Sequence, residues 1–257
     1  VAPTAIKYGA SDNQKEKLFA DMSQNLINFG IGFSEYFGSR DSSGLNISDN
    51  KVTGKTLFVL DADFASHVMI ADNKGQIGVV SLDSNGIEMI DLTTVDKTRT
   101  YKEMHFSDTP IEILDKTKSS SFAVEMALDA GRIIAAADSL GASQAMINKA
   151  VEYSKERKQF NRVIGSFQAV KHMCAEMAAE LEPCYSLVWH AAHSFDDSSE
   201  DARLMACLAK SHISEVSKMV SKKATEVHGG MGFTDLLGLH FWFKRIGLNR
   251  HILGSPE

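Results

Sequence analysis

Residues 153–168, with the sequence YSKERKQFNRVIGSFQ, contain the point where one long helical pattern stops and another begins. Before this stretch, apolar residues recur at spacings of three and four, and the helix closes on basic residues that end at Arg157. Gln159 and the aromatic Phe160 follow the break, and helical spacing resumes at about residue 163. This arrangement predicts two antiparallel helices joined by a short loop.

The helical pattern extends on both sides of this stretch. From about residue 119 to the end, proline and turn signals almost vanish, and we expect no strand beyond residue 130. Gly229-Gly230 supplies residues that tolerate a left-handed backbone, so a helix should end there. The spacing predicts four helices that form an antiparallel bundle, over 119–157, 163–195, 199–227 and 236–252.

Upstream of about residue 115, short β-type runs alternate with Gly, Asp and Asn turns. The runs are Thr56–Leu60, His67–Ala71, Ile77–Leu82 and Arg99–Phe106. Asn85-Gly86, between the last two, suits a β-hairpin, and no helix is expected within 56–106. Residues 12–27 read as one or two short helices. The fold class predicted is α+β, with a β-barrel-like middle domain followed by the helical bundle.

Bulk properties exclude several classes of protein. The 257 residues carry a formal net charge of −6, and the Lys and Arg residues form no basic stripe, which argues against nucleic-acid binding. No run of about 18 apolar residues predicts a membrane span, and no signal-peptide pattern opens the sequence. The three cysteines lack metal-ligand spacing and are typical of a reduced, cytoplasmic protein, so no metal is expected.

Arg157 stands at the end of a long helix, where a guanidinium can bind a pyrophosphate through forked hydrogen bonds. Free N–H groups at the start of the next helix would reinforce such a site. Basic residues at a helix C-terminus also interact favourably with the helix dipole, which accounts for most such runs. Both interpretations remain open from the residues alone.

A second stretch, residues 226–233 (EVHGGMGF), places three glycines where a ligand could approach the backbone closely. A helix stop followed by a turn is the plainer interpretation. His228 could carry a proton, although a lone histidine at a helix end is more often structural. The sequence has no GxGxxG after a strand, no Ser-His-Asp order, no HExxH and no CxxC, so the usual Rossmann, hydrolase and metal patterns are not supported.

Together these two stretches resemble the C-terminal domain of the acyl-CoA dehydrogenase family. The resemblance rests on Arg157-Lys-Gln-Phe, on Gln168 eight residues after that phenylalanine, and on the His-Gly-Gly-Met-Gly-Phe of residues 228–233. Upstream, Gly32-Phe-Ser34-Glu35 and Gly54-Lys-Thr-Leu-Phe58 resemble segments of the family's β domain. The resemblance spans nearly the whole chain, and its helical motif is the more specific part.

The resemblance implies three domains. Residues 1–27 would be the end of an N-terminal helical domain that is mostly absent, 28–117 the β domain, and 118–257 the C-terminal four-helix domain. A homo- or heterotetramer is implied, with FAD bound between domains and across a subunit interface. The implied process is fatty acid or lipid metabolism.

The resemblance also implies a role for particular residues. Ser34 matches the hydroxyl residue near the flavin ring, and Phe58 stands where the family usually has a tryptophan beside that ring. Asp129 and Arg132 match positions beside the acyl-CoA. The positions that match those holding the ADP half of a neighbour's FAD are Arg157, Gln159, Phe160, Gln168, Glu226, Gly229 and Gly230.

The implied reaction is α,β-dehydrogenation of an acyl-CoA thioester. A carboxylate removes the α proton while FAD accepts the β hydrogen as hydride, which gives the 2-enoyl-CoA. Electron-transfer flavoprotein is the implied electron acceptor. The chain would then be an FAD-dependent acyl-CoA dehydrogenase.

The sequence departs from the family pattern at the catalytic base. The usual base precedes a Gly-Thr or Gly-Ser after the last helix, and Leu253 precedes Gly254-Ser255 here. Some members carry the base on the first long helix instead, where this chain has Gly131. Neither leucine nor glycine can take a proton. Three further positions differ from the usual family residue. Ile31 and Leu60, on the flavin side, stand where a tyrosine and a threonine are common, and Arg40 stands where a small serine would contact CoA.

Three hypotheses follow. The chain is a competent dehydrogenase with its base elsewhere, for which Glu257 is the nearest carboxylate. Alternatively, it is a non-catalytic subunit of a heteromeric dehydrogenase that completes a partner's FAD site. The third hypothesis is a helical scaffold with the family fold and no flavin, which a colourless purified protein would favour.

Overall fold

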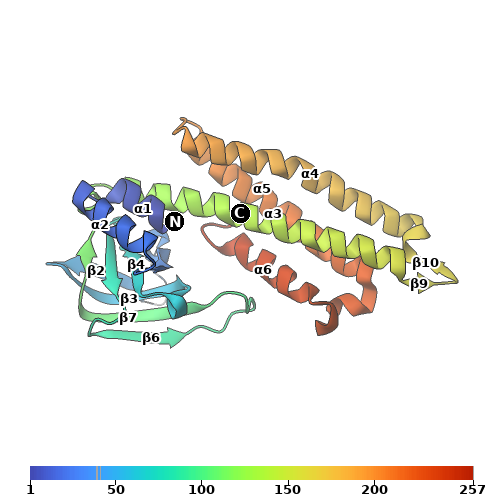
Figure 1. Ribbon diagram of the computed structural model, residues 1–257. Helices are drawn as coiled ribbons and strands as arrows, with labels where there is room; N and C mark the ends of the chain where they lie inside the picture. The colour runs from blue at the N-terminus through green and yellow to red at the C-terminus, as the bar shows by residue number, and fades with distance from the viewer. Residues whose placement is uncertain (39, 41, 257) are drawn as a thin grey trace. The chain divides into compact units, whose positions relative to one another are not determined.

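The computed structural model describes residues 1–38, 40 and 42–256 (Figure 1). The chain divides into two compact units, Val1–Ala130 and Gly131–Glu257. Helix α3 (Phe122–Glu156) begins in the first unit and continues into the second. Each unit has its own cluster of buried apolar residues.

Two helices, α1 (Ala2–Gly9) and α2 (Asp12–Ser23), open the first unit. At the start of α2 the Ser11 N–H donates to the Gln14 side chain (3.1 Å), as in a capping box. The Gln14 amide also donates to the carbonyl of Ile113 (2.9 Å). The same glutamine therefore stabilises the helix start and joins α2 to the sheet.

The sheet of the first unit has the strand order β6-β7-β3-β1-β4-β5-β8, with β2 paired to β3. Among the strand pairs that the structure describes, only β1 and β4 run parallel. Among the described residues no pairing joins β6 to β8, so the sheet is open. The middle domain is therefore rich in strands, as predicted, but it does not close into a barrel. The strands are β1 (Phe29–Gly32), β2 (Gly44–Ser48), β3 (Lys51–Leu60), β4 (His67–Ala71), β5 (Ile77–Ser81), β6 (Ile87–Asp91), β7 (Tyr101–Pro110) and β8 (Glu112–Ile113).

The prediction of a β-hairpin at Asn85-Gly86 is wrong. β6 pairs with β7, where Ile87 lies opposite Phe106, and β5 pairs with β4 and β8 instead. Gly86 is still required, because its φ is +83° and an added Cβ would lie 2.3 Å from the Ser107 carbonyl oxygen. The dipeptide turns the chain between strands that are not neighbours in the sheet.

The second unit is helical, and the four predicted helices are confirmed as α3, α4 (Gln168–Asp196), α5 (Ala202–His228) and α6 (Leu239–His251). They lie alongside one another in Figure 1. Apolar residues from all four form one core. Within the described residues, no helix is long and apolar enough to cross a membrane.

Two expectations about element type are wrong in detail. Strands β9 (Lys158–Gln159) and β10 (Arg162–Val163) form a small hairpin beyond residue 130, because the two residues between them both adopt positive φ. A short 3-10 helix lies within 56–106, at Ala62–Phe64. The other 3-10 helices are Ser34–Phe37, Asp115–Lys118, Ile164–Ser166, Gly229–Phe233 and Asp235–Leu237.

Candidate functional site

In the sheet unit, Ser34 and Glu35 follow β1 and are fastened to β3. Glu35 is buried, with 1% of its surface exposed. Its carboxylate accepts hydrogen bonds from the hydroxyl of Thr56 and from the N–H of Leu57 (2.9 Å), and the Ser34 hydroxyl lies 2.8 Å away. These contacts replace the water that a buried carboxylate has lost. The Ser34-Glu35 dipeptide is therefore set against residues 56–57.

Phe58 follows these residues directly on β3. Its φ is +56°, which is unusual for a bulky side chain, and the β3–β7 register shifts between Thr56 and Val59. The bulge leaves the Phe58 ring about half exposed. Because the Ser34 hydroxyl is also within hydrogen-bonding distance of the Leu57 carbonyl, the structure brings the two predicted flavin-ring residues, Ser34 and Phe58, close together.

The two flavin-side departures from the family pattern are also neighbours. Ile31 on β1 lies directly opposite Leu60 on β3. Directly opposite residues on antiparallel strands share one face of the sheet and contact each other. The aliphatic replacements therefore form one pair. Arg40, the third departure, is exposed.

In the helical unit, Arg157 begins the β9–β10 hairpin, and its carbonyl accepts a hydrogen bond from Ile164 (2.8 Å). Phe160 stands at the hairpin tip with φ +52° and is 87% exposed. Below it, the Arg162 guanidinium lies 3.8 Å from the centre of the Phe167 ring. The contact between Arg162 and Phe167 thus holds the base of the hairpin, while Phe160 at its tip is exposed to solvent.

The end of α5 lies beside the end of α3. His228 is buried, its ring centre is 4.6 Å from that of Tyr153, and its Nδ1 lies 2.7 Å from the Ala224 carbonyl. A carbonyl only accepts, so Nδ1 carries the proton in this contact. These contacts pack His228, at the start of the glycine turn, against the end of α3, which Arg157 directly follows.

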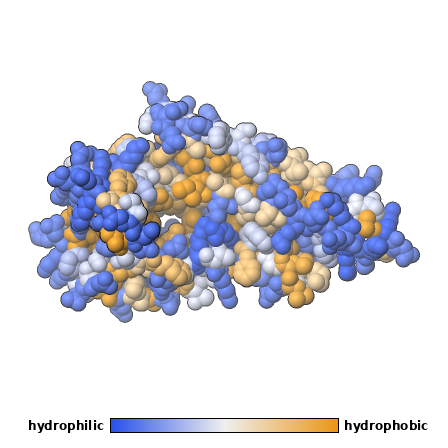
Figure 2. Space-filling view, viewed as in Figure 1, coloured by the Kyte–Doolittle hydropathy of each residue, from blue (hydrophilic) through white to orange (hydrophobic). Residues whose placement is uncertain are grey.

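The glycines after His228 fit close approach by a ligand. Gly229 has φ +57° and ψ −142°, a conformation that only glycine adopts readily. A Cβ added at Gly230 would meet no atom of the chain within 4 Å, so packing within the chain does not require glycine there. All the ADP-side candidates of this unit are exposed: Arg157, Gln159, Phe160, Gln168, Glu226, Gly229 and Gly230. Figure 2 shows one face of the molecule, on which hydrophobic and hydrophilic residues are interspersed.

The two predicted substrate residues lie one turn apart on α3, on either side of the unit boundary. Asp129 is buried, and Arg132 is partly buried. The Arg132 Nε donates to the carbonyl of Leu253 (3.0 Å). Arg132 therefore contacts the segment in which the resemblance predicts the family's base.

Neither position at which the resemblance predicts a base supplies a proton acceptor. Leu253 adopts φ +59° in the segment after α6, and Gly131 is buried within α3. Glu257, the carboxylate considered as an alternative base, lies outside the described residues.

Sequence reasoning missed two polar groups in the helical unit. Asp138 on α3 makes a bidentate ion pair with Arg245 on α6, at 2.8 Å through each nitrogen, and accepts a further bond from Asn249. Lys210 on α5 is buried. Its spacing from Ala206 and Ile213, both fully buried, places it on the core face, and that spacing is a signal visible in the sequence.

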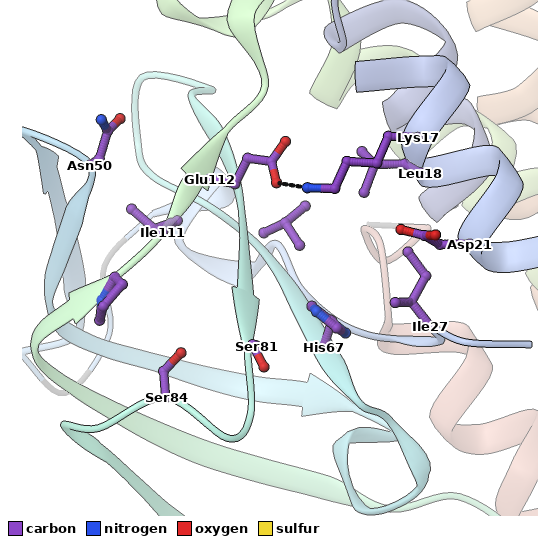
Figure 3. Close-up of a pocket in the computed structure, with 12 residues that line it drawn as sticks. Lys17, Leu18, Asp21, Ile27, Asn50, His67, Ser81, Ser84, Ile111 and Glu112 are labelled. Atoms are coloured by element: carbon purple, nitrogen blue, oxygen red, sulfur yellow. Dashed lines mark hydrogen bonds and ion pairs between the residues drawn. The ribbon is translucent and has the colours of Figure 1, made fainter. Parts of the chain in front are cut away.

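A pocket of about 350 Å³ lies in the sheet unit, beside α2 (Figure 3). Lys17 and Glu112 pair with each other at its edge (3.1 Å). Burial lowers the pKa of His67, which also lines it. None of the predicted flavin or substrate residues lines this pocket, and its charged groups partly satisfy one another. Among the described residues no three His, Cys, Asp or Glu side chains are grouped as metal ligands.

Comparison with known proteins places this geometry in a family. The sequence model described as "Acyl-CoA dehydrogenase, C-terminal domain" matches residues 122–257. The chain belongs to the acyl-CoA dehydrogenase family. This confirms the resemblance that was drawn from the helical motif.

Individual acyl-CoA dehydrogenase relatives support this assignment. The chain is 32% identical over 180 residues to the caffeyl-CoA reductase-Etf complex subunit CarC of Acetobacterium woodii, which covers 70% of this chain and 43% of CarC. It is 28% identical over 246 residues to a 3-(aryl)acrylate reductase of Clostridium sporogenes, covering 87% of this chain and 64% of that protein. The chain thus spans less than two thirds of these relatives.

The butyryl-CoA dehydrogenase of Megasphaera elsdenii has the same fold. The two structures superpose with a TM-score of 0.88 at 21% identity, over 99% of this chain and 71% of that one. At this identity the likeness concerns the fold alone.

Proposed function

We propose that this chain is part of an FAD-dependent acyl-CoA dehydrogenase, which forms a 2-enoyl-CoA from an acyl-CoA thioester. The observation that carries the proposal is the group of exposed, family-matched residues at one end of the helical unit. There Arg157, the β9–β10 hairpin and Gly229-Gly230 meet around the contact between Tyr153 and His228. Family membership says which ligand to test there.

The residues present fit FAD. A guanidinium and exposed glycine N–H groups are suited to a pyrophosphate, and an exposed aromatic such as Phe160 is suited to stacking. Arg157, Gln159, Gln168, Glu226 and Gly229-Gly230 would hold the ADP half, while Ser34 and Phe58 would lie near the ring. When bound, FAD supplies the acceptor for hydride. Because the seven ADP-side residues are exposed, we propose that they serve the FAD of another subunit in a homo- or heterotetramer.

The chain's own residues would bind and orient the thioester, with Asp129 and Arg132 beside the acyl-CoA. Electron-transfer flavoprotein is the acceptor we propose, since the similar CarC is a subunit of an Etf complex. The assay is direct: the full gene product is purified and acyl-CoA-dependent reduction of a dye is followed. A colourless protein that also takes up no added FAD would contradict the proposal.

A second candidate function is favoured by one specific observation. Leu253 and Gly131 stand where the resemblance predicts the family's base, and neither can accept a proton. The chain would then be a non-catalytic subunit that completes a partner's FAD site. Co-purification with a related, carboxylate-bearing subunit, and activity only in that complex, would distinguish this candidate from the first.

A further inference from the structure

Lys210 is a lysine in the interior of the helical bundle. It lies on α5 with 4% of its surface exposed, between the fully buried Ala206 and Ile213. Lysine is almost never buried to this extent unless its ammonium group is paired. The partners of that ammonium group therefore indicate why it is there.

Each hydrogen of the Lys210 ammonium has one acceptor. Nζ lies 3.4 Å from the hydroxyl of Ser214, 3.2 Å from the carbonyl oxygen of Arg250 and 3.2 Å from that of Gly254. An ammonium has three donor hydrogens, so these contacts use all of them. Two of the three acceptors are backbone carbonyls on either side of Leu253.

A second cation binds the backbone between those carbonyls. Arg132, on α3, donates from Nε to the Leu253 carbonyl (3.0 Å). Residues 250, 253 and 254 thus each present a carbonyl to a positive charge from another helix. We call Lys210, Arg132 and these three carbonyls the carbonyl clamp.

The last turn of α6, where the clamped segment begins, is also held by side-chain contacts. The side chain of Asn249, fully buried, donates to Asp138 and to the hydroxyl of Ser139 (3.1 Å). The Arg250 side chain donates to Glu215 (2.6 Å). The last turn of α6 therefore leads into the clamp in a defined position.

The clamp is costly for the bundle. Burial, together with the smaller effect of repulsion from Arg132 and Arg250, lowers the pKa of Lys210 to about 8. A charge that is kept in the interior at such a cost, beside a segment where the family places its catalytic group, indicates a task other than stability.

We propose that Lys210 is a positioning residue, which fixes the 250–254 segment by its backbone so that the side chain at position 253 has a defined place. The contacts with the 250–254 segment are all to backbone carbonyl oxygens, so the clamp acts whatever side chain stands at 253. It keeps the segment ordered even in this chain, where that side chain is a leucine. Only the role of the segment beside an acyl-CoA rests on the proposed function.

Hydrogen exchange of the full chain, together with any subunit that co-purifies, tests the clamp without requiring activity. Lys210→Met removes the donors at similar volume, Lys210→Arg keeps a charged donor, and Lys222→Met removes an exposed lysine from the same helix as a matched control. Loss of charge-assisted bonds should speed exchange in residues 251–255 by about tenfold or more in Lys210→Met. Lys210→Arg should restore part of the protection, and Lys222→Met should resemble the parent.

Equal exchange in the parent and in folded Lys210→Met overturns the proposal. If Lys210→Met does not fold, Arg132→Gln removes the other half of the clamp, and equal exchange there overturns it as well.

In an assembly that oxidises acyl-CoA, Lys210→Met should also raise the KM for acyl-CoA severalfold while flavin content stays the same. A faster-exchanging segment with unchanged kcat and KM contradicts the positioning role. An assembly that shows no flavin and no turnover contradicts the proposed function instead, and the exchange result still decides whether the clamp exists.

Discussion

The sheet unit and the helical unit present their candidate flavin residues in opposite ways. In the sheet unit, Ser34 lies against the buried Glu35 and next to the Phe58 bulge, so the chain itself fixes these groups. In the helical unit, Arg157 and Gly229-Gly230 are exposed, although the helices beneath them are joined by Tyr153 and His228. The difference teaches that substitutions at the first set should affect folding, and those at the second should affect ligand binding alone.

The C-terminal segment tests this distinction most strongly. Its backbone is held by Arg132 and Lys210, but the side chain at position 253 is a leucine, which cannot accept a proton. Leu253→Glu should raise acyl-CoA turnover, and since general-base catalysis contributes about 10²–10⁴-fold, the gain should fall in that range. Turnover is measured with a dye acceptor and several acyl-CoAs on the intact gene product.

Leu253→Gln is the matched control for this experiment, since it has a similar shape and accepts no proton. Gly131→Glu tests the other family position, which is buried in α3 and therefore sterically harder. Strong turnover in the unmodified chain alone would refute the reading of a missing base.

Glu35 supports the sheet-unit residues Ser34 and Phe58, so its substitution should lower the stability of the fold. Glu35→Ala leaves the Leu57 N–H and the Thr56 hydroxyl without their buried acceptor, so the free energy of unfolding should fall by about 3 kcal/mol. Chemical denaturation monitors the loss. Glu88→Ala, on an exposed carboxylate of the same sheet, should change it by less than about 0.5 kcal/mol. Equal effects of the two substitutions on the free energy of unfolding would show that Glu35 has no special structural role.

Lys210 links stability to pH within the helical unit. The pKa of Lys210 is about 8 in the folded state, against the ordinary value of 10.5 expected in the unfolded state. Between pH 8 and 10.5 the unfolded state therefore binds more protons than the folded state, so the free energy of unfolding rises with pH. Over this window the parent should gain on the order of 2–3 kcal/mol relative to Lys210→Met. Denaturant titrations of both proteins at pH 7.5 and at about pH 10 measure the difference, and a constant difference would show that the buried ammonium does not titrate there.

Arg157 should behave in the opposite way to Glu35. Arg157→Ala removes a forked donor from the proposed pyrophosphate site, so FAD retention should weaken by about tenfold or more, with the free energy of unfolding nearly unchanged. Flavin content after dialysis measures retention. Lys158→Ala, on the neighbouring exposed basic residue, is the control. Unchanged flavin content in Arg157→Ala would remove this residue from the site.

Local pattern predicted much of the fold. Four helices and the stop at Gly229 follow from apolar spacing and glycine chemistry, and the short helix expected within residues 12–27 is confirmed as α2. The partner of β6 was not predictable, because Asn85-Gly86 signals a turn but not which strand lies beside the next one. The hairpin at Phe160-Asn161 was missed because two residues with positive φ leave little trace in composition.

The candidate site was predictable only where side-chain type carries the chemistry. Arg157 and the glycines could be singled out from the sequence, and the family resemblance supplied Ser34 and Phe58. The contacts of Glu35 with residues 56–57 join segments about twenty positions apart, and those of Lys210 join segments forty or more apart. Such contacts depend on tertiary packing, which no local pattern encodes.

The pairing of Ile31 with Leu60 bears on how this chain diverged from other acyl-CoA dehydrogenases. The family commonly has tyrosine and threonine at these positions, and the two residues here lie directly opposite each other. A change at one of them alters the surroundings of the other, so the two substitutions are coupled rather than independent events. A lineage that replaced one residue first would have carried a mismatched pair, and reversing either change alone recreates that intermediate. The two positions therefore behave as one coupled unit of packing.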